Sequence, residues 1–232
     1  MKRVMAPSAA PMQLWWADLD DAARGLDVDA ALLSDAERAR AARFVHERHR
    51  RRYTAAHAAL RRLLSQHTGR PAGELMFRDG AFGKPALIEP AVGGRSHCAF
   101  NMSHCEHLAV FAVAPDGDIG VDVELLRPMD DADALARHHF TAGEQAAFNA
   151  AAAAQRTLRF LYGWTRKEAC LKAIGCGLAV EPHSFEVGLS PESREVEVLA
   201  PHGTVVVDVE SVVDGARAVI SWARLRPGHC AS

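Results

Sequence analysis

The stretch Pro115-Asp-Gly-Asp-Ile-Gly-Val-Asp-Val-Glu124 indicates both the fold of this chain and its chemistry. Pro-Asp-Gly is a turn signal, because proline fixes φ and glycine tolerates positive φ. From Ile119 onward apolar residues alternate with others, which predicts a strand with Asp122 and Glu124 on the face opposite its apolar side. At a rise of ~3.3 Å per residue their Cβ atoms would lie roughly 7 Å apart, so both carboxylates could bind one cation. Mg²⁺ prefers such oxygen ligands. The alternative is an ordinary strand whose acidic residues face water.

Residues 157–174 predict a long helix that ends at the following glycines. At 100° per residue its core stripe runs from Phe160 to Ile174. Glu168 and Lys172 are four residues apart on a neighbouring face of the helix. They either form an exposed ion pair or belong to a functional site. Lys167 falls within the apolar stripe, where its ammonium either extends to water or meets an anion. If this helix and the acidic strand meet, their carboxylates and lysines suit Mg²⁺-assisted phosphate chemistry.

The remaining patterns divide the chain into two similar halves. A helix is expected to begin at the capping box of Ser34, and further helices are expected at 46–66, 130–138, 141–155 and 157–174. Strands are expected at 12–19, 75–78, 96–102, 108–114, 119–125, 185–187, 195–199, 204–209 and 217–225. The strands at 96–102, 108–114 and 119–125 predict an antiparallel meander. We therefore expect an α+β fold of two pseudo-symmetric subdomains, 1–115 and 116–232. Each would pack a small antiparallel sheet on a long helix, with the active site at the interface between them.

The composition is typical of a globular protein with a sizeable core, since 49% of the 232 residues are apolar and 24% are charged. A net charge of −2 argues against a nucleic-acid-binding protein. No apolar run approaches the ~20 residues of a membrane span, and Pro7 and Pro11 interrupt the short apolar run near the first residues, which argues against a signal peptide. Five cysteines without Cys-x-x-Cys spacing favour a reduced, cytoplasmic protein. Seven arginines between Arg38 and Arg52 either coat a solvated helix face or bind an anion such as phosphate.

Five short motifs together resemble a known family. Ile119-Gly-Val-Asp-Val-Glu124 is followed by Trp164-Thr-Arg-Lys-Glu-Ala-Cys-Leu-Lys172 and Gly175-Cys-Gly-Leu178, and preceded by Gly83-Lys-Pro85 and Phe100-Asn-Met-Ser-His104. This order and spacing resembles the 4′-phosphopantetheinyl transferase superfamily, in its Sfp-type branch with two subdomains in one chain. The resemblance covers roughly 44–178. It implies a monomer that transfers the phosphopantetheine arm of coenzyme A to a serine of an acyl or peptidyl carrier protein and releases 3′,5′-ADP.

The resemblance also implies roles for individual residues. Mg²⁺ would be bound by Asp122, Glu124 and Glu168, and the carrier serine would lose its proton to Glu168 or Glu124, through water. Lys172 would neutralise phosphate charge, and Lys167 would help the leaving group. The expected catalytic set is Glu168, Glu124, Lys172, Lys167 and His104, and the expected coenzyme A contacts are Arg52, Lys84, Ser103, His104 and Lys172. Glu144 matches a glutamate near the metal of the family.

Two features leave alternatives open. Cys105 stands where the family frequently has serine, as a packing residue or as a reactive thiol, and the cluster His97, Cys98, His104, Cys105 and His107 fits no standard zinc spacing. A second candidate function is an Mg²⁺-dependent phosphodiester or pyrophosphate hydrolase that acts on a small nucleotide. A third is a module that binds carrier domains without catalysis, against which the three acidic positions argue. No Gly-x-x-x-x-Gly-Lys-Ser/Thr loop is present, which argues against a nucleoside triphosphate enzyme.

Overall fold

The computed structural model describes residues 1–4, 12–22, 25–88, 98–215 and 217–227. The first half contains, in order, β1 (Lys2–Val4), β2 (Gln13–Asp18), α1 (Leu19–Ala22), α2 (Leu26–Leu32), α3 (Asp35–Ala42), α4 (Glu47–Thr68), a 3₁₀ turn (Ala72–Glu74), β3 (Met76–Asp79), β4 (Pro85–Ile88), β5 (Ala99–Cys105) and β6 (Leu108–Ala114). The second half contains β7 (Ile119–Leu125), α5 (Ala132–His139), α6 (Ala142–Ala150), α7 (Ala153–Ile174), two 3₁₀ turns (Gly177–Ala179 and Pro182–Ser184), β8 (Arg194–Ala200), β9 (Gly203–Asp214) and β10 (Ala218–Leu225).

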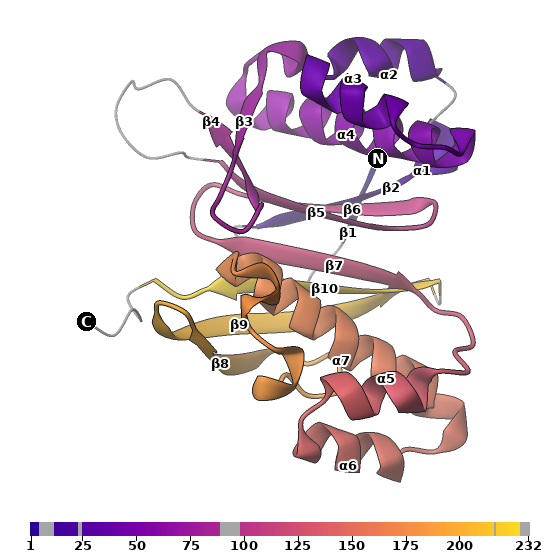
Figure 1. Cartoon of the computed structure of the whole chain (residues 1–232), viewed down its shortest axis with the longest axis vertical. Coiled ribbons are helices and arrows are strands. Elements are labelled where there is room, and N and C mark those ends of the chain that lie inside the picture. Colours follow the sequence, from indigo (N-terminus) through magenta and orange to yellow (C-terminus); the bar gives the residue numbers. More distant parts are fainter. Residues whose placement is uncertain (5–11, 23–24, 89–97, 216, 228–232) are drawn as a thin grey trace.

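Two antiparallel four-stranded sheets form the centre of the molecule (Figure 1). The first has the order β1-β2-β6-β5, and the second has the order β7-β10-β9-β8. The sheets pack face to face, α4 covers the outer face of the first sheet, and α7 covers the outer face of the second. This confirms the predicted α+β fold of two similar subdomains, each with a sheet packed on a long helix.

Strand β6 shows how the sequence encodes these layers. All seven of its residues are buried, because both of its faces are covered. Ala109, Phe111 and Val113 pack toward α4, whereas the residues between them pack toward the second sheet. The uninterrupted apolar run therefore reflects a strand at the middle of a layered core.

The helix ends agree with the local sequence signals. Ser34 and Thr141 begin α3 and α6 with complete capping boxes, in which Glu37 and Glu144 accept the backbone N–H of the cap. Both long helices end at glycines in the left-handed conformation, at φ 70° after α4 and φ 73° after α7. Among the described residues no helix combines the length and the apolar character that crossing a membrane requires.

Three sequence-based predictions are wrong. Strand β7 does not extend the β5–β6 hairpin into a meander, because β6 already pairs with β2 on one side and β5 on the other. It pairs instead with β10 and forms the edge of the second sheet. The segment 185–187 is a loop and not a strand. The N–H of Val187 donates to Glu144 Oε1 at 2.7 Å and not to a neighbouring strand. The helix predicted over 141–155 ends at Ala150.

Candidate active site

The acidic face of β7 is covered by α7. Gly120 lies on this face, and a Cβ atom added to it would be 2.1 Å from the carbonyl oxygen of Ala169 and 2.4 Å from the nitrogen of Ala173. The backbones of strand and helix therefore touch, which only a glycine in the strand allows. Asp122, two residues further, is 5% exposed. The acidic strand does not face water, and it meets the helix that carries Glu168 and Lys172. Sequence reasoning placed Gly120 on this face but assigned it no role.

The carboxylate of Asp122 joins three elements. Its Oδ1 accepts hydrogen bonds from Ser103 Oγ on β5 at 2.7 Å and from Lys172 Nζ on α7 at 2.5 Å. Lys172 also donates to Ser103 Oγ at 3.1 Å. The second oxygen, Oδ2, is buried and has no hydrogen-bond partner among the described residues. Buried polar atoms nearly always have a partner, so this oxygen is free to bind a group that the chain itself does not supply.

The neighbouring edge strands β5 and β7 belong to different sheets and meet through side chains. Besides the Ser103 contact, Asn101 Oδ1 accepts the N–H of Val121 at 2.9 Å, and Cys105 Sγ donates to Glu124 Oε2 at 3.1 Å. Residues 101, 103 and 105 alternate along β5 and therefore share one face. Asn101 thus connects β5 to β7, a structural role that sequence reasoning missed. The signal was its position two residues before Ser103, which puts both side chains on the same face of the strand.

The thiol of Cys105 is a hydrogen-bond donor here. Burial raises its pKa to about 11, and the adjacent Glu124 contributes to this rise. The thiol is therefore protonated at neutral pH, which argues against a reactive thiolate. It orients the carboxylate of Glu124, which together with Asp122 and Glu168 makes up the acidic group.

Glu168 adds a third carboxylate. Burial raises the pKa of Glu168, Asp122 and Glu124 raise it further, and Lys172 lowers it. In the described part of the chain no three His, Cys, Asp or Glu side chains are arranged as a group that could hold a metal ion. Mg²⁺, however, commonly binds only one or two carboxylates and completes its shell with water and phosphate oxygens. The unpaired Asp122 Oδ2 and the excess of negative charge fit such a site.

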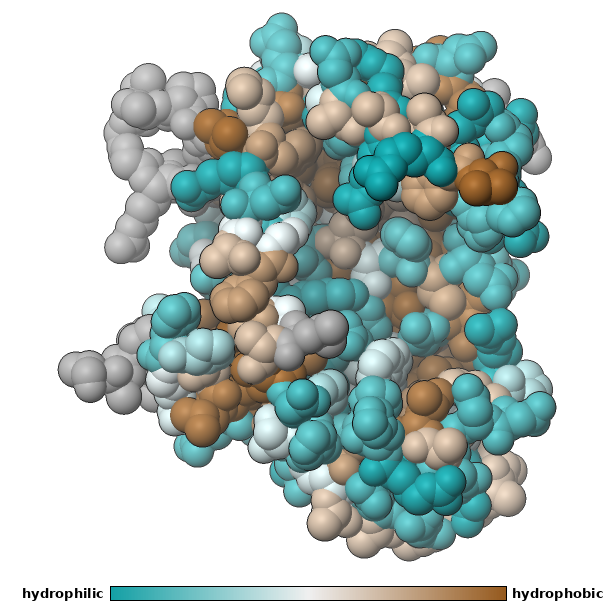
Figure 2. Space-filling view, in the orientation of Figure 1, coloured by the Kyte–Doolittle hydropathy of each residue, from teal (hydrophilic) through white to brown (hydrophobic). Residues whose placement is uncertain are grey.

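A cavity of about 340 Å³ opens beside these residues. Phe82 to Pro85, at the tip of the β3–β4 hairpin, form part of its wall, and the rest comes from β5 and from the end of α7. The predicted residues Lys84, Glu168 and Lys172 therefore line one cavity between the two subdomains. Figure 1 shows the hairpin of the first half reaching the end of α7, and Figure 2 shows no gap between the halves there.

Two of the predicted coenzyme A contacts, His104 and Arg52, make no hydrogen bond to Asp122, Glu124 or Glu168 among the described residues. His104 follows Ser103 on β5, and it is exposed although the surrounding protein partly desolvates its ring. This desolvation lowers the pKa of His104, and His57 and Lys172 act in the same direction, so the imidazole is neutral at pH 7. Arg52 on α4 donates to both carboxylate oxygens of Asp20, at 2.7 and 2.6 Å. None of the hydrogen bonds among the described residues joins Arg52 to the acidic group, and its phosphate contact stays a prediction.

The placement of Lys167 does not agree with the catalytic role expected from the resemblance. Its side chain is fully buried, and its Nζ lies 2.7 Å from Glu144 Oε2 and donates to the carbonyl oxygens of Pro182 and Phe185. Glu144 also accepts the N–H of Val187, so the pair is engaged with the core and with the loop after α7. The lysine therefore meets an anion within the core, and the pair fastens α6 and α7 to the loop after Pro182.

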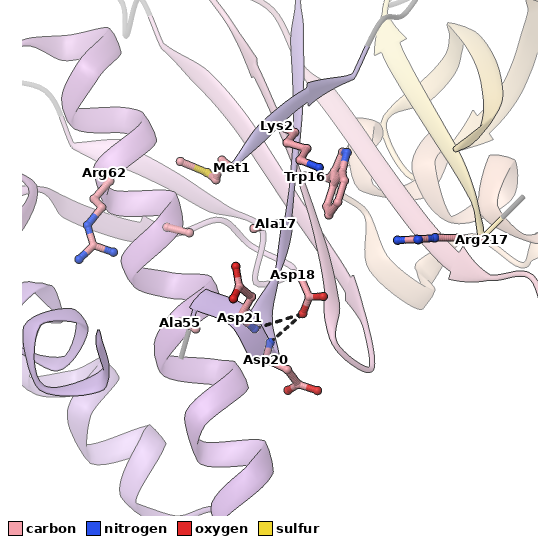
Figure 3. Close-up of a pocket in the computed structure, with 11 residues that line it drawn as sticks. Met1, Lys2, Trp16, Ala17, Asp18, Asp20, Asp21, Ala55, Arg62 and Arg217 are labelled. Carbon is pink, nitrogen blue, oxygen red and sulfur yellow. Dashed lines mark hydrogen bonds between the residues drawn. The ribbon is translucent and has the colours of Figure 1, made fainter. Parts of the chain in front are cut away.

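A larger hollow, of about 740 Å³, lies between β2 and α4 (Figure 3). Its charged side chains are largely engaged with the protein: Asp18 accepts the N–H groups of Asp20 and Asp21, Arg62 pairs with Asp29, and Lys2 lies over the ring of Trp16. It contains none of the predicted site residues. Size alone therefore does not identify the site. The smaller cavity is the candidate active site, because Lys84, Glu168 and Lys172 line it.

Comparisons with known proteins agree with this geometry. A family model described as 4′-phosphopantetheinyl transferase superfamily matches residues 118–213, and one described as 4′-phosphopantetheinyl transferase, N-terminal, matches residues 21–116. The chain is 38% identical over 214 residues to the 4′-phosphopantetheinyl transferase HetI of Nostoc sp., covering 91% of this chain and 89% of that protein. It is 25% identical over 195 residues to the 4′-phosphopantetheinyl transferase ffp of Bacillus subtilis, covering 84% of each. The chain therefore belongs to the 4′-phosphopantetheinyl transferase superfamily.

Proposed function

We propose that this protein transfers the 4′-phosphopantetheine arm of coenzyme A to a serine of an acyl or peptidyl carrier protein, in an Mg²⁺-dependent reaction. The observation that carries the proposal is the acidic face of β7, which is buried against α7 and contacts Lys172 beside a cavity lined by both subdomains. Membership of the family supports the same reaction. A cytoplasmic location and a monomeric state stay predictions from the sequence.

In the proposed reaction the serine oxygen forms a bond to the β-phosphorus of coenzyme A, the P–O bond of the pyrophosphate breaks, and 3′,5′-ADP leaves. Mg²⁺ would be bound by one or two of the carboxylates of Asp122, Glu124 and Glu168, with water and phosphate oxygens as its other ligands, and would neutralise charge at the pyrophosphate. Glu168, whose pKa is raised by burial, is suited to take the serine proton, directly or through water. Lys172 lies 2.5 Å from Asp122 and supplies a second positive charge for phosphate.

The residues of the first subdomain position coenzyme A in this proposal. Ser103 donates to Asp122 and accepts from Lys172, so we expect its hydroxyl to hold these two side chains in position next to the phosphates. His104 and Arg52 would contact the phosphates of coenzyme A and its 3′-phosphate, as the resemblance implies. Such chemistry depends mainly on positioning and charge, which agrees with a site that offers no nucleophile of its own.

The test is intact-protein mass spectrometry of apo carrier proteins after incubation with this protein, coenzyme A and Mg²⁺. A gain of one phosphopantetheine that EDTA abolishes supports the proposal. Glu168→Ala should abolish the gain, whereas Glu197→Ala on the exposed side of β8 serves as the matched control and should not. Hydrolysis of coenzyme A without any carrier would favour the phosphodiester hydrolase instead. No gain on fatty-acid, polyketide or peptidyl carriers would overturn the transferase.

A further inference from the structure

The β3–β4 hairpin is attached differently at its two ends. It belongs to neither four-stranded sheet, because within the described part of the chain its two strands pair with each other and with no other strand. Its base packs into the core of the first subdomain, through Leu87 and Phe77. Its tip, residues 80–84, reaches the second subdomain and forms a wall of the cavity beside the acidic group.

Lys84 makes the polar contacts of this tip with the second subdomain. Its Nζ donates to the carbonyl oxygen of Ala173 at 2.8 Å and to Asp118 Oδ1 at 3.1 Å. Ala173 lies in the last turn of α7, where carbonyl groups lack helical partners and the helix dipole favours a cation. The side chain of Lys84 is 19% exposed, whereas that of Asp118 is 61% exposed. The contact to the helix is thus the more protected of the two, and exposed pairs such as the second contribute little.

The glycines after α7 leave room for this contact. A Cβ atom at Gly175 would lie 3.1 Å from Cδ of Lys84, so the aliphatic part of the lysine lies directly on the end of the helix. A Cβ atom at Gly177 would lie 3.7 Å from Cβ of Phe82. The hairpin tip therefore lies against the end of α7 through Lys84 and close to the following 3₁₀ turn through Phe82.

We propose that Lys84 is a positioning residue, which fastens the β3–β4 hairpin to the end of α7 and so sets the width of the cavity. The cavity is the one assigned above to coenzyme A, so the proposal rests on the proposed function for its ligand. The ammonium is engaged within the protein, and burial lowers its pKa, as expected for a side chain enclosed between two elements. Without the fastening, the hairpin would leave the binding-competent position for part of the time, and coenzyme A would bind more weakly in proportion.

The first experiment is hydrogen exchange on the free protein with Lys84→Met, which keeps the length of the side chain and removes its charge. The amides of Gly80 and Gly83 bond within the hairpin tip, and the amide of Gly175 bonds to Leu171 at the end of α7. All three should exchange faster in the variant, while the strands β9 and β10 should not change. Unchanged exchange at the hairpin tip would overturn the proposal, whatever the enzyme does with carriers.

The second experiment separates fastening from direct contact with coenzyme A. In the Lys84→Met background, Phe82→Cys and Gly177→Cys would place two Cβ atoms about 3.7 Å apart, within the range that a disulfide requires. We expect Lys84→Met to weaken coenzyme A binding about tenfold when the added cysteines are reduced, and the disulfide to restore it. The matched reference is the same cysteine pair with Lys84 present, and peptide mapping verifies that Cys176 has not paired instead.

The outcomes are distinct. Restored affinity in the oxidised protein supports a positioning role. Affinity that stays low after verified crosslinking would show that the ammonium contacts coenzyme A itself, and would overturn the proposal. If the reference protein fails to bind coenzyme A at all, the proposed function fails, while the exchange experiment still decides whether Lys84 fastens the hairpin.

Discussion

Gly120→Ala tests whether the contact between β7 and α7 holds the site together. The added Cβ would lie 2.1 Å from a backbone oxygen of α7, and real Cβ atoms essentially never approach closer than 3.0 Å. The strand and the helix would therefore have to separate by about 0.9 Å, because the atoms met are backbone atoms that cannot rotate away. Overpacking typically costs 1–3 kcal/mol, and we expect about 3 kcal/mol or more here. The same shift would move Asp122 away from Lys172, so transfer activity should fall in the folded protein as well.

Urea unfolding followed by circular dichroism measures this loss. With an m-value of about 1–3 kcal/mol/M, the midpoint should fall by about 1 M or more. Gly73→Ala is the matched control, because a Cβ at Gly73 meets no atom within 4 Å, and its effect should stay within about 1 kcal/mol. A Gly120→Ala protein with unchanged midpoint and activity would refute the reasoning, since it would mean that helix and strand are not in backbone contact.

Three further predictions test single side chains. Burial would raise the pKa of Glu37, but its hydrogen bonds lower it from 4.5 to about 2; Glu37→Gln should therefore cost roughly 3 kcal/mol above pH 4.5 and progressively less as the pH falls toward 2. Urea unfolding across this range checks the trend, and a loss that persists undiminished in acid contradicts it. Lys167→Met should lower the free energy of unfolding by about 3–5 kcal/mol, because it leaves Glu144 buried and unpaired. Glu144→Gln should then cost less in the Lys167→Met protein than it does alone, and strictly additive losses in urea unfolding would exclude the coupling. Lys172→Met removes the ammonium at Asp122, so added Mg²⁺ should raise its melting temperature more than that of the unchanged protein, and equal rises would count against a shared cation site.

Local signals in the sequence predicted most of the elements. The capping boxes at Ser34 and Thr141 mark helix starts that the structure confirms, because the side chain and the amide that define each box lie within three residues. The alternation in β7 predicted its two faces correctly, and the spacing in α7 placed Glu168 beside Lys172. Each of these patterns is complete within one element, so it can be read without knowing what packs against it.

The partners of these elements could not be predicted in the same way. The strand pattern of β7 is identical whether it continues a meander or begins a second sheet, and the choice depends on β2, which occupies the free edge of β6. Helical spacing placed Lys167 in the apolar stripe, but only the packing of α6 shows that its anion is Glu144 rather than a phosphate. The resemblance named candidate site residues, and the structure shows which of them share a cavity. Glu168 and Lys172 line it, whereas Lys167 pairs with Glu144 in the core.

The site and the core use opposite faces of the same strand. Ile119, Val121 and Val123 join the apolar layer between the two sheets, while Gly120, Asp122 and Glu124 face α7 and β5. A one-residue slip of β7 would exchange these faces, burying the carboxylates between the sheets and exposing the apolar residues to the cavity. The register of β7 against β10 therefore fixes the charge of the site, and the apolar core that sets this register also holds the carboxylates in position.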